Sequence, residues 1–434
     1  MSTAAPPASD FARLGQLEPL MDKCVHCGFC LSTCPSYLLL GQEMDSPRGR
    51  IYMMKAGVEG RIPIGDGMVG HFDTCLGCMA CETACPSGVR YAPLIEETRA
   101  AIEHHHDRPA GERLFRSLLF MLLPYPARLR LFALPLVFVN LLRGWTGLLT
   151  LLPRRLSNLI DLAPDAKLSG LMGRVPERTP AAGTTRLRVG LMTGCVQRVF
   201  FSHVNDATVR VLAAEGCEVL APGDQGCCGA LALHSGRDED ARTFARGLIA
   251  SFERTNVDVV VVNAAGCGST MKGYGELLKD DPVWASRAKA FDARVRDVTE
   301  VVAGLDPVRA TRSPIEMRVA YHDACHLAHA QGVRQPPRDV LASIPGLTIV
   351  PIADGDICCG SAGIFNLVQP EMAAELGRRK AATIDEARPD VVATTNPGCM
   401  LQIGAAGRKA GNGRPVFHVV ELLDASIRGE RPAL

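Results

Sequence analysis

The chain has 434 residues, 47% of them hydrophobic, so it is long enough to form two or three domains with real cores. Its 47 lysines and arginines nearly balance its 46 aspartates and glutamates. Because no excess of positive charge is present to attract phosphates, the composition excludes nucleic acid as an expected partner. The N-terminal residues MSTAAPPASDFARLG lack the basic start and apolar run of a secretory signal, so we expect a cytoplasmic protein with reduced thiols.

Two runs of four cysteines near the N-terminus share the spacing CxxCxxCxxxCP. This is the bacterial ferredoxin spacing, in which three close thiolates bind one [4Fe-4S] cluster and the fourth cysteine binds the other cluster. Zinc is the alternative, but zinc sites usually pair two CxxC hooks and lack a third cysteine followed by proline. We therefore predict two [4Fe-4S] clusters. The predicted ligands are Cys24, Cys27, Cys30 and Cys85 for cluster one, and Cys75, Cys78, Cys81 and Cys34 for cluster two.

Residues 118–152 are strongly apolar and include the runs LLFMLLP and LFALPLVFVNLL. Arginines and prolines interrupt this stretch, and its longest uncharged run is about 12 residues, whereas a membrane span needs about 20. We predict helices that pack on the protein or on a partner. A helix lying in the membrane interface is the alternative. The Pro/Gly/Thr-rich segment RVPERTPAAGTT then follows as a linker.

The remaining chain consists of two segments that repeat each other. In each segment a single cysteine precedes a Cys-Cys-Gly motif and a further Gly-Cys, and the matched cysteines are separated by 130, 131, 131 and 132 residues. The apolar runs before these cysteines read as strands, and helix-like stretches lie between them, as expected for two α/β units with parallel strands. The repeated cysteines are Cys195, Cys227, Cys228 and Cys267 in the first segment, and Cys325, Cys358, Cys359 and Cys399 in the second.

Each repeated cysteine follows the carboxyl end of a predicted strand, which is where open α/β sheets form their ligand crevices. We expect the four thiols of each repeat to converge, and they are candidates for further iron-sulfur clusters, since four thiolates suffice for a [4Fe-4S] cube. The alternative is that they are small buried residues, although adjacent cysteines in both repeats argue against it. Cys217 has no counterpart and is expected to be a buried free thiol. His322, His326 and His329 surround Cys325, and we expect hydrogen bonding or capping from them, with metal ligation as the alternative.

These observations predict an α+β multi-domain protein. An α-helical domain with two ferredoxin-type clusters spans residues 1–103, and an apolar helical connector with its linker spans 104–185. Two tandem α/β cysteine-rich repeats related by pseudo-two-fold symmetry span 186–305 and 306–434.

Several signatures of catalysis are missing from the sequence. No GxGxxG follows a predicted strand, and there is no GxxxxGK[ST], nucleophile elbow or HExxH. Iron-sulfur clusters pass single electrons, whereas oxidation of an organic substrate usually removes two, and a flavin normally splits such a pair. We therefore expect an electron relay, with no catalytic residue of its own, that works with a flavoprotein.

With these residues in place, the sequence resembles the family of glycolate oxidase iron-sulfur subunits. The resemblance covers nearly the whole chain and is carried by CVHCGFCLSTCPSYLLLGQEMDSPRGRIYMMK, CLGCMACETACPSGVRY, GCCGA, AAGCGSTMKGYG, CCGSAGIFNL and TTNPGC. It implies a hetero-oligomer in which FAD-bearing partner subunits oxidise glycolate to glyoxylate. It also implies an acceptor at the membrane, expected to be quinone, and thus a chain that is cytoplasmic or peripheral on the inner face of the cell membrane.

The sequence departs from the heterodisulfide reductases that share this cysteine-rich motif. Their motif ends in CxxC, but Thr270 and Gln402 occupy the last cysteine position here, which counts against thiol-disulfide reduction. Two further alternatives remain: the iron-sulfur subunit of another flavin-linked 2-hydroxyacid or glycerol-3-phosphate dehydrogenase, and a scaffold with structural clusters. The scaffold is disfavoured because clusters that exchange cysteine ligands normally lie close enough to exchange electrons.

Overall fold

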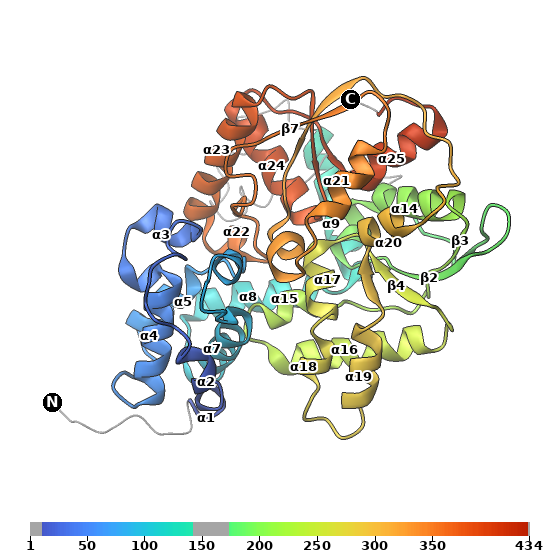
Figure 1. Cartoon of the computed structure of the whole chain (residues 1–434). Coiled ribbons are helices and arrows are strands. Elements are labelled where there is room, and N and C mark those ends of the chain that lie inside the picture. Colours follow the sequence, from blue (N-terminus) through green and yellow to red (C-terminus); the bar gives the residue numbers. More distant parts are fainter. Residues whose placement is uncertain (1–10, 142–172, 433–434) are drawn as a thin grey trace.

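The computed structural model describes residues 11–141 and 173–432, and Figure 1 shows their arrangement. Residues 142–152 of the predicted apolar stretch, and the connector as far as residue 172, lie outside the described residues. Helices form the N-terminal part, drawn in blue in Figure 1, and two sheets with their covering helices form the rest.

Short helices and tight turns build the N-terminal domain. Pro35 follows Cys34 and begins one helix, while Ser46 caps the next by accepting a 3.0 Å hydrogen bond from the Gly49 amide. Met54, Phe72 and other apolar side chains pack between these helices and form the core beneath the cysteine loops. The elements are α1 (Ala12–Gly15), α2 (Glu18–Met21), α3 (Pro35–Leu40), the 3-10 helix η1 (Glu43–Asp45), α4 (Pro47–Val58), α5 (Asp66–Asp73), α6 (Ala80–Thr83) and α7 (Tyr91–His105).

Two helices of the connector, α8 (Ala110–Leu122) and α9 (Pro126–Leu141), follow this domain. Leu119 and Phe120 of α8 pack against Ile364, and Leu129 and Ala133 of α9 pack in a core with Val199, so both helices lie on the protein as predicted. No single helix among the described residues is long and apolar enough to cross a membrane. The two helical segments Ala110–Leu122 and Pro126–Leu134, bent by 108° relative to each other, are together long and apolar enough to cross a membrane, by length and composition alone.

The first cysteine-rich repeat is a five-stranded sheet with the order β1-β3-β2-β4-β5, parallel except for β1. Its strands are β1 (Arg178–Thr179), β2 (Leu187–Met192), β3 (Cys217–Leu220), β4 (Val259–Val262) and β5 (Val295–Asp297). Its helices are α13 (Val196–Phe200), α14 (Ser202–Ala214), α15 (Ala230–Leu233), α16 (Asp238–Glu253), α17 (Ala265–Met271), α18 (Tyr274–Leu277), α19 (Ala285–Asp292) and α20 (Val298–Gly304).

The second repeat is a parallel four-stranded sheet with the order β7-β6-β8-β9, which reproduces the order β3-β2-β4-β5 of the first repeat. Its strands are β6 (Met317–Tyr321), β7 (Leu347–Val350), β8 (Val391–Thr394) and β9 (Val416–His418). Its helices are the π-helix η2 (His326–Ala330), α21 (Gln335–Ala342), α22 (Phe365–Val368), α23 (Pro370–Glu386), α24 (Pro397–Ala410) and α25 (Val419–Arg428).

The two repeats share one core. The last helix of each repeat packs on the other repeat, α25 against α14 and α20 against α21, and apolar side chains of both sheets meet in a single buried group. Arg210 of α14 also bonds both carboxylate oxygens of Asp424 in α25, at 2.9 and 2.7 Å. The repeats therefore form one body with the predicted pseudo-symmetry.

The predicted fold class is confirmed, with a helical ferredoxin-type domain followed by two α/β repeats. The sequence did not indicate the strand β1, which lies in the segment expected to be a linker and pairs antiparallel with β3. Two residues are too few to produce an alternating pattern, so no sequence signal marks this strand. Cys217 lies fully buried in β3 as a free thiol, as expected.

Candidate iron-sulfur and metal centres

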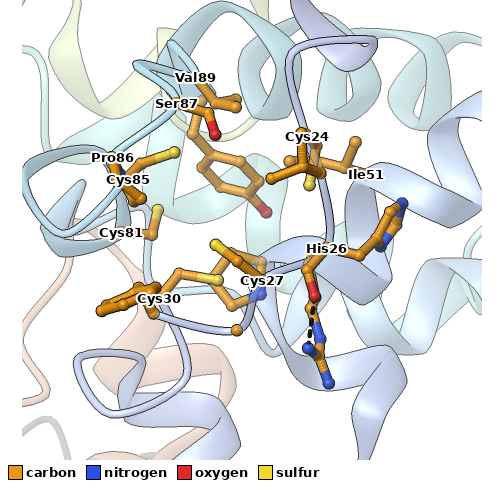
Figure 2. Close-up of a pocket in the computed structure, with 16 residues that line it drawn as sticks. Cys24, His26, Cys27, Cys30, Ile51, Cys81, Cys85, Pro86, Ser87 and Val89 are labelled. Atoms are coloured by element: carbon orange, nitrogen blue, oxygen red, sulfur yellow. Dashed lines mark hydrogen bonds between the residues drawn. The ribbon is translucent and has the colours of Figure 1, made fainter.

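Ferredoxin site one comprises the thiols of Cys24, Cys27, Cys30 and Cys85, which line one pocket (Figure 2). The first three belong to the loop before α3, where His26 and Gly28 adopt left-handed backbone angles of 55° and 87°. Arg48 fixes this loop by donating a 2.8 Å hydrogen bond to the His26 carbonyl. Cys85 and Cys81 of the second cysteine run line the same pocket, so it holds the four thiols predicted for cluster one together with one predicted for cluster two.

The thiols of site one affect one another electrostatically. Burial is the main cause that raises the pKa of Cys24, and the nearby Cys85 and Cys27 raise it further. Burial also raises the pKa of Cys30 to about 11. Cys27 is exposed, so one edge of site one faces solvent.

Ferredoxin site two comprises the thiols of Cys34, Cys75, Cys78 and Cys81. Burial raises the pKa of Cys81 well above its usual range, and Cys78, Cys75 and Cys34 raise it further, so all four thiols are neighbours. The structure thus brings Cys34 of the first run to three cysteines of the second. Unlike site one, this site has no exposed thiol: Cys34, Cys75 and Cys78 are buried and Cys81 is half-buried.

Two arginines distinguish Cys75 from its neighbours. Burial favours the protonated thiol, yet Arg50 and Arg99 outweigh that effect and lower the pKa of Cys75. The Gly77 amide also donates to the Cys75 sulfur at 3.4 Å. Arg99 additionally bonds the carbonyls of Cys75 and His234, which joins the ferredoxin domain to the first repeat. Sequence reasoning missed both arginines, because no local pattern marks a helical arginine as the neighbour of a distant cysteine.

The first CCG site comprises Cys195, Cys227, Cys228 and Cys267. Cys195 and Cys227 have sulfurs 3.6 Å apart, and Cys228 forms side-chain hydrogen bonds with Cys227 and Cys267. The hydrogen bond with Cys227, together with burial, raises the pKa of Cys195 well above its usual range. Apolar residues such as Met192 enclose the group. The predicted convergence of these thiols is present in the structure.

The second CCG site comprises Cys325, Cys358, Cys359 and Cys399. Cys325 and Cys358 have sulfurs 4.0 Å apart, and Cys359 forms side-chain hydrogen bonds with Cys358 and Cys399. The hydrogen bond with Cys358, together with burial, raises the pKa of Cys325 well above its usual range. The cysteines of the two repeats therefore contact one another in the same order.

The donor chemistry fits iron-sulfur binding. All seventeen cysteines lie in the described residues and all are free, and sixteen of them form the four groups above. Grouped thiols that are buried and have raised pKa values ionise at high cost unless a cation neutralises them. A metal centre with sulfur ligands supplies that neutralisation.

The three histidines near Cys325 have different environments. His326 has its Nδ1 atom 3.6 Å from the Cys325 sulfur, and His329 contacts the Thr83 hydroxyl and the Asp356 carbonyl, both at 3.0 Å. These contacts agree with the expected hydrogen-bonding roles. His322 instead lies with Cys359 and Cys399, and the ligand atoms of the three residues are within 4.8 Å of one another. Burial lowers the pKa of His322 well below its usual range, and Lys380 lowers it further.

Comparison with known proteins agrees with this architecture. Residues 20–89 match the model of the 4Fe-4S dicluster domain, and residues 189–272 and 319–404 match that of the cysteine-rich domain. A solved structure, described as that of a hypothetical protein from Helicobacter pylori, superposes with a TM-score of 0.56 at 9% identity over 98% of this chain and 77% of its own. That likeness concerns the fold alone.

The chain is thus an iron-sulfur electron-transfer subunit of an oxidoreductase complex. It is 38% identical over 413 residues to the probable glycolate oxidase iron-sulfur subunit of Bacillus subtilis, with 92% of each chain covered. It is 33% identical over 422 residues to the glycolate oxidase iron-sulfur subunit of Escherichia coli, covering 96% of this chain and 97% of the relative. The chain belongs to the family of glycolate oxidase iron-sulfur subunits.

A lactate utilization protein A from Exiguobacterium is also similar, at 30% identity over 240 residues. The match covers 98% of that protein but 55% of this chain.

Proposed function

We propose that this chain receives electrons from an FAD-bearing partner subunit that oxidises glycolate to glyoxylate, and that it passes them toward a quinone at the membrane. Membership of the glycolate oxidase iron-sulfur subunit family is the observation that carries this proposal. When bound, [4Fe-4S] clusters exchange one electron at a time, which suits them to relay the electron pair collected by a flavin.

The ligand assignment is part of the proposal. Cys24, Cys27, Cys30 and Cys85 would hold one [4Fe-4S] cluster, and Cys34, Cys75, Cys78 and Cys81 would hold the other. Cys85 lies near enough to Cys24 to raise its pKa, and Cys34 does the same to Cys81, which supports this exchange of fourth ligands.

The protein's own residues would have distinct tasks at these sites. Arg50 and Arg99 stabilise negative charge at Cys75, and the burial of site two excludes water. Exposed Cys27, flanked by exposed Val25 and Phe29, leaves site one open to a partner. We therefore place the flavoprotein contact at the site-one edge, where electrons need to cross the least protein.

We also propose that the chain works in the cytoplasm and associates peripherally with the inner face of the cell membrane. The outer faces of α8 and α9 support this proposal, because Leu114, Leu118, Met121, Leu131 and Phe132 are exposed there. Arg113 and Arg128 lie on the same helices, and a combination of apolar and basic side chains favours adsorption to anionic lipid.

A second candidate substrate is another 2-hydroxyacid. The similarity to a lactate utilization protein A favours it, although that match covers about half of this chain. The substrate would bind the partner in either case, so the role of this chain as a relay would be unchanged.

The proposal is tested by purifying the complex anaerobically with its flavoprotein partner and adding glycolate or lactate without an acceptor. Glycolate should bleach the flavin and then the broad iron-sulfur absorption, and a quinone should restore both. The isolated chain should not be reduced by glycolate. Turnover of glycolate by the isolated chain would overturn the relay role. Reduction of the complex by lactate but not by glycolate would overturn the substrate assignment.

A further inference from the structure

The two CCG sites differ at positions that the fold makes equivalent. Val189 of β2 pairs with Val259, and Val319 of β6 pairs with Val391, so the two strands are aligned residue by residue. In this alignment, His322 follows β6 at the position that Met192 occupies at the end of β2. An imidazole therefore adjoins the second site where a thioether adjoins the first.

A second difference lies on the long helix that covers each site. Gly229 approaches Ala241 of α16, and Gly360 approaches Ala373 of α23, which aligns these helices with an offset of 132 residues. Lys380 then corresponds to Leu248, which is fully buried in apolar surroundings. Lys380 is also buried, donates a 2.5 Å hydrogen bond to the Asp354 carbonyl and lies close enough to Cys358 and Cys359 to interact with their charge.

The His322 side chain is oriented as a metal ligand would be. It is 1% exposed, and its Nδ1 atom has no hydrogen-bond partner among the residues that the structure describes. The ring also interacts with the Gly355 backbone through a hydrogen bond that raises the pKa of His322. An imidazole that donates from one nitrogen to a carbonyl presents a bare lone pair at the other, the usual arrangement of metal-bound histidine.

The unpartnered nitrogen needs an explanation, because leaving a buried polar atom without a hydrogen-bond partner is energetically costly. Atoms of the described residues do not supply that partner, yet the sulfurs of Cys359 and Cys399 lie within 4.8 Å of a ring nitrogen of His322. Thiolate and imidazole together suit zinc and iron among the common metals.

We propose that the second CCG site is a metal centre of mixed ligation, in which Nδ1 of His322 binds the metal together with the thiolates of Cys359 and Cys399, whereas the first CCG site has sulfur ligands alone. The metal is zinc or the iron of a cluster, since both accept this donor set. The ammonium of Lys380 offsets part of the negative charge of the thiolates. The inference goes beyond the proposed function, because it depends on neither the substrate nor the acceptor.

The test uses the full chain in its complex, purified anaerobically, and begins with the content of iron, sulfide and zinc. If the site holds iron, pulsed electron paramagnetic resonance of the reduced protein should show a directly bound nitrogen, and its coupling should change when histidine rings carry ¹⁵N. If it holds zinc, X-ray absorption at the zinc edge should show a nitrogen at about 2.0–2.1 Å beside the sulfurs. Either result supports the proposal, and both are obtained on the unmodified protein.

Two variants then identify the ligand. His322→Leu should abolish the nitrogen signal, while His326→Leu removes a neighbouring imidazole of the same site and should preserve it. Absence of metal from the second site, an all-sulfur spectrum of the unmodified protein, a nitrogen signal that survives in His322→Leu, or its loss in His326→Leu would each overturn the proposal. Should His322→Leu fail to fold, the isotope and absorption measurements on the unmodified protein decide alone.

Discussion

Cys78 of ferredoxin site two and Cys325 of the second CCG site lie in one buried group, although 247 residues separate them in sequence. Burial raises the pKa of Cys78 well above its usual range, and Cys325 is the neighbour that raises it most. Cys358 belongs to the same group, whereas Cys195, Cys227 and Cys228 of the first repeat lie in a different core. The dicluster domain therefore meets the second repeat through its cysteines.

The first prediction concerns Cys78→Ala. Loss of one of four thiolates should empty site two and lower the iron content by about four atoms per chain. Flavin reduction by glycolate should persist, because the flavin site is on the partner. The rate of quinone reduction should fall by roughly tenfold or more. Iron analysis and the two activities of the complex measure these effects.

The matched control for this prediction is Cys217→Ala, which removes a buried cysteine of β3 that belongs to none of the four groups. It should retain its iron and its quinone reduction. An unmodified rate in the Cys78→Ala complex would refute the relay.

The second prediction tests the exchange of fourth ligands between the cysteine runs. Cys34→Ala and Cys78→Ala affect the same site, so their combination should cost one cluster, about four irons per chain. Cys34→Ala combined with Cys30→Ala affects both sites and should cost two clusters. Iron analysis with electron paramagnetic resonance of the reduced protein counts them. If each run held its own cluster, the two double variants would show the opposite pattern.

Much of this architecture follows from sequence spacing alone. The ferredoxin runs predict their ligands because thiols three or four residues apart in a turn reach one centre, and the cysteine offsets reveal the repeat. Contacts between distant segments leave no such signal. Nothing near Cys78 in the sequence predicts its contact with Cys325, and nothing in the sequence of α7 predicts that Arg99 bonds the Cys75 carbonyl. The sequence indicated hydrogen bonding or metal ligation for His322, but its counterpart Met192 is identified by strand register and not by a motif.

The third prediction is that Arg50→Gln destabilises the dicluster domain by about 3 kcal/mol. Arg50 is fully buried, lies 3.5 Å from the Asp45 carboxylate and donates to the His71 carbonyl at 2.7 Å. Removing its charge leaves a buried carboxylate without its cation, which typically costs 3–5 kcal/mol. The low end applies because Thr74 still donates to Asp45 at 2.7 Å.

Urea unfolding of the anaerobic protein measures this loss of stability. Arg61→Gln is the control, because it breaks the exposed ion pair with Glu59 and should shift the midpoint far less. Equal shifts in the two variants would contradict the structural role of Arg50.

The fourth prediction concerns Glu421, the acidic residue of the capping box that begins α25. Burial, with a smaller contribution from Asp424, raises the pKa of Glu421 to about 7. The pKa of this carboxyl is near 4.5 in the unfolded chain and higher in the folded protein. Its contribution to stability is therefore fully present below pH 4.5 and is lost as the pH rises through 7. Glu421→Gln keeps an oxygen acceptor for the His418 amide and should be more stable than the unmodified chain above pH 7.

Urea midpoints at pH 6 and pH 8 check this prediction, and the advantage of Glu421→Gln should grow by about 1 kcal/mol between them. Burial lowers the pKa of His418 to about 4, so both proteins should lose stability equally as the pH falls from 6.5 toward 4. An advantage that does not vary with pH would show that Glu421 is not protonated in the folded protein.

The fifth prediction concerns the exposed faces of α8 and α9. Leu114 is 63% exposed and Leu131 is 72% exposed, so replacing both with glutamate should leave the buried contacts of these helices intact. Lipid adsorption combines burial of apolar side chains with attraction of basic residues to anionic headgroups, and the double variant opposes both. The unmodified complex should float with vesicles containing anionic lipid, whereas Leu114→Glu/Leu131→Glu should stay in solution with its iron content and flavin reduction unchanged.

Val283→Glu, a control at a 65% exposed apolar residue of the first repeat, should float normally. Equal flotation of all three proteins would exclude this face as the membrane contact.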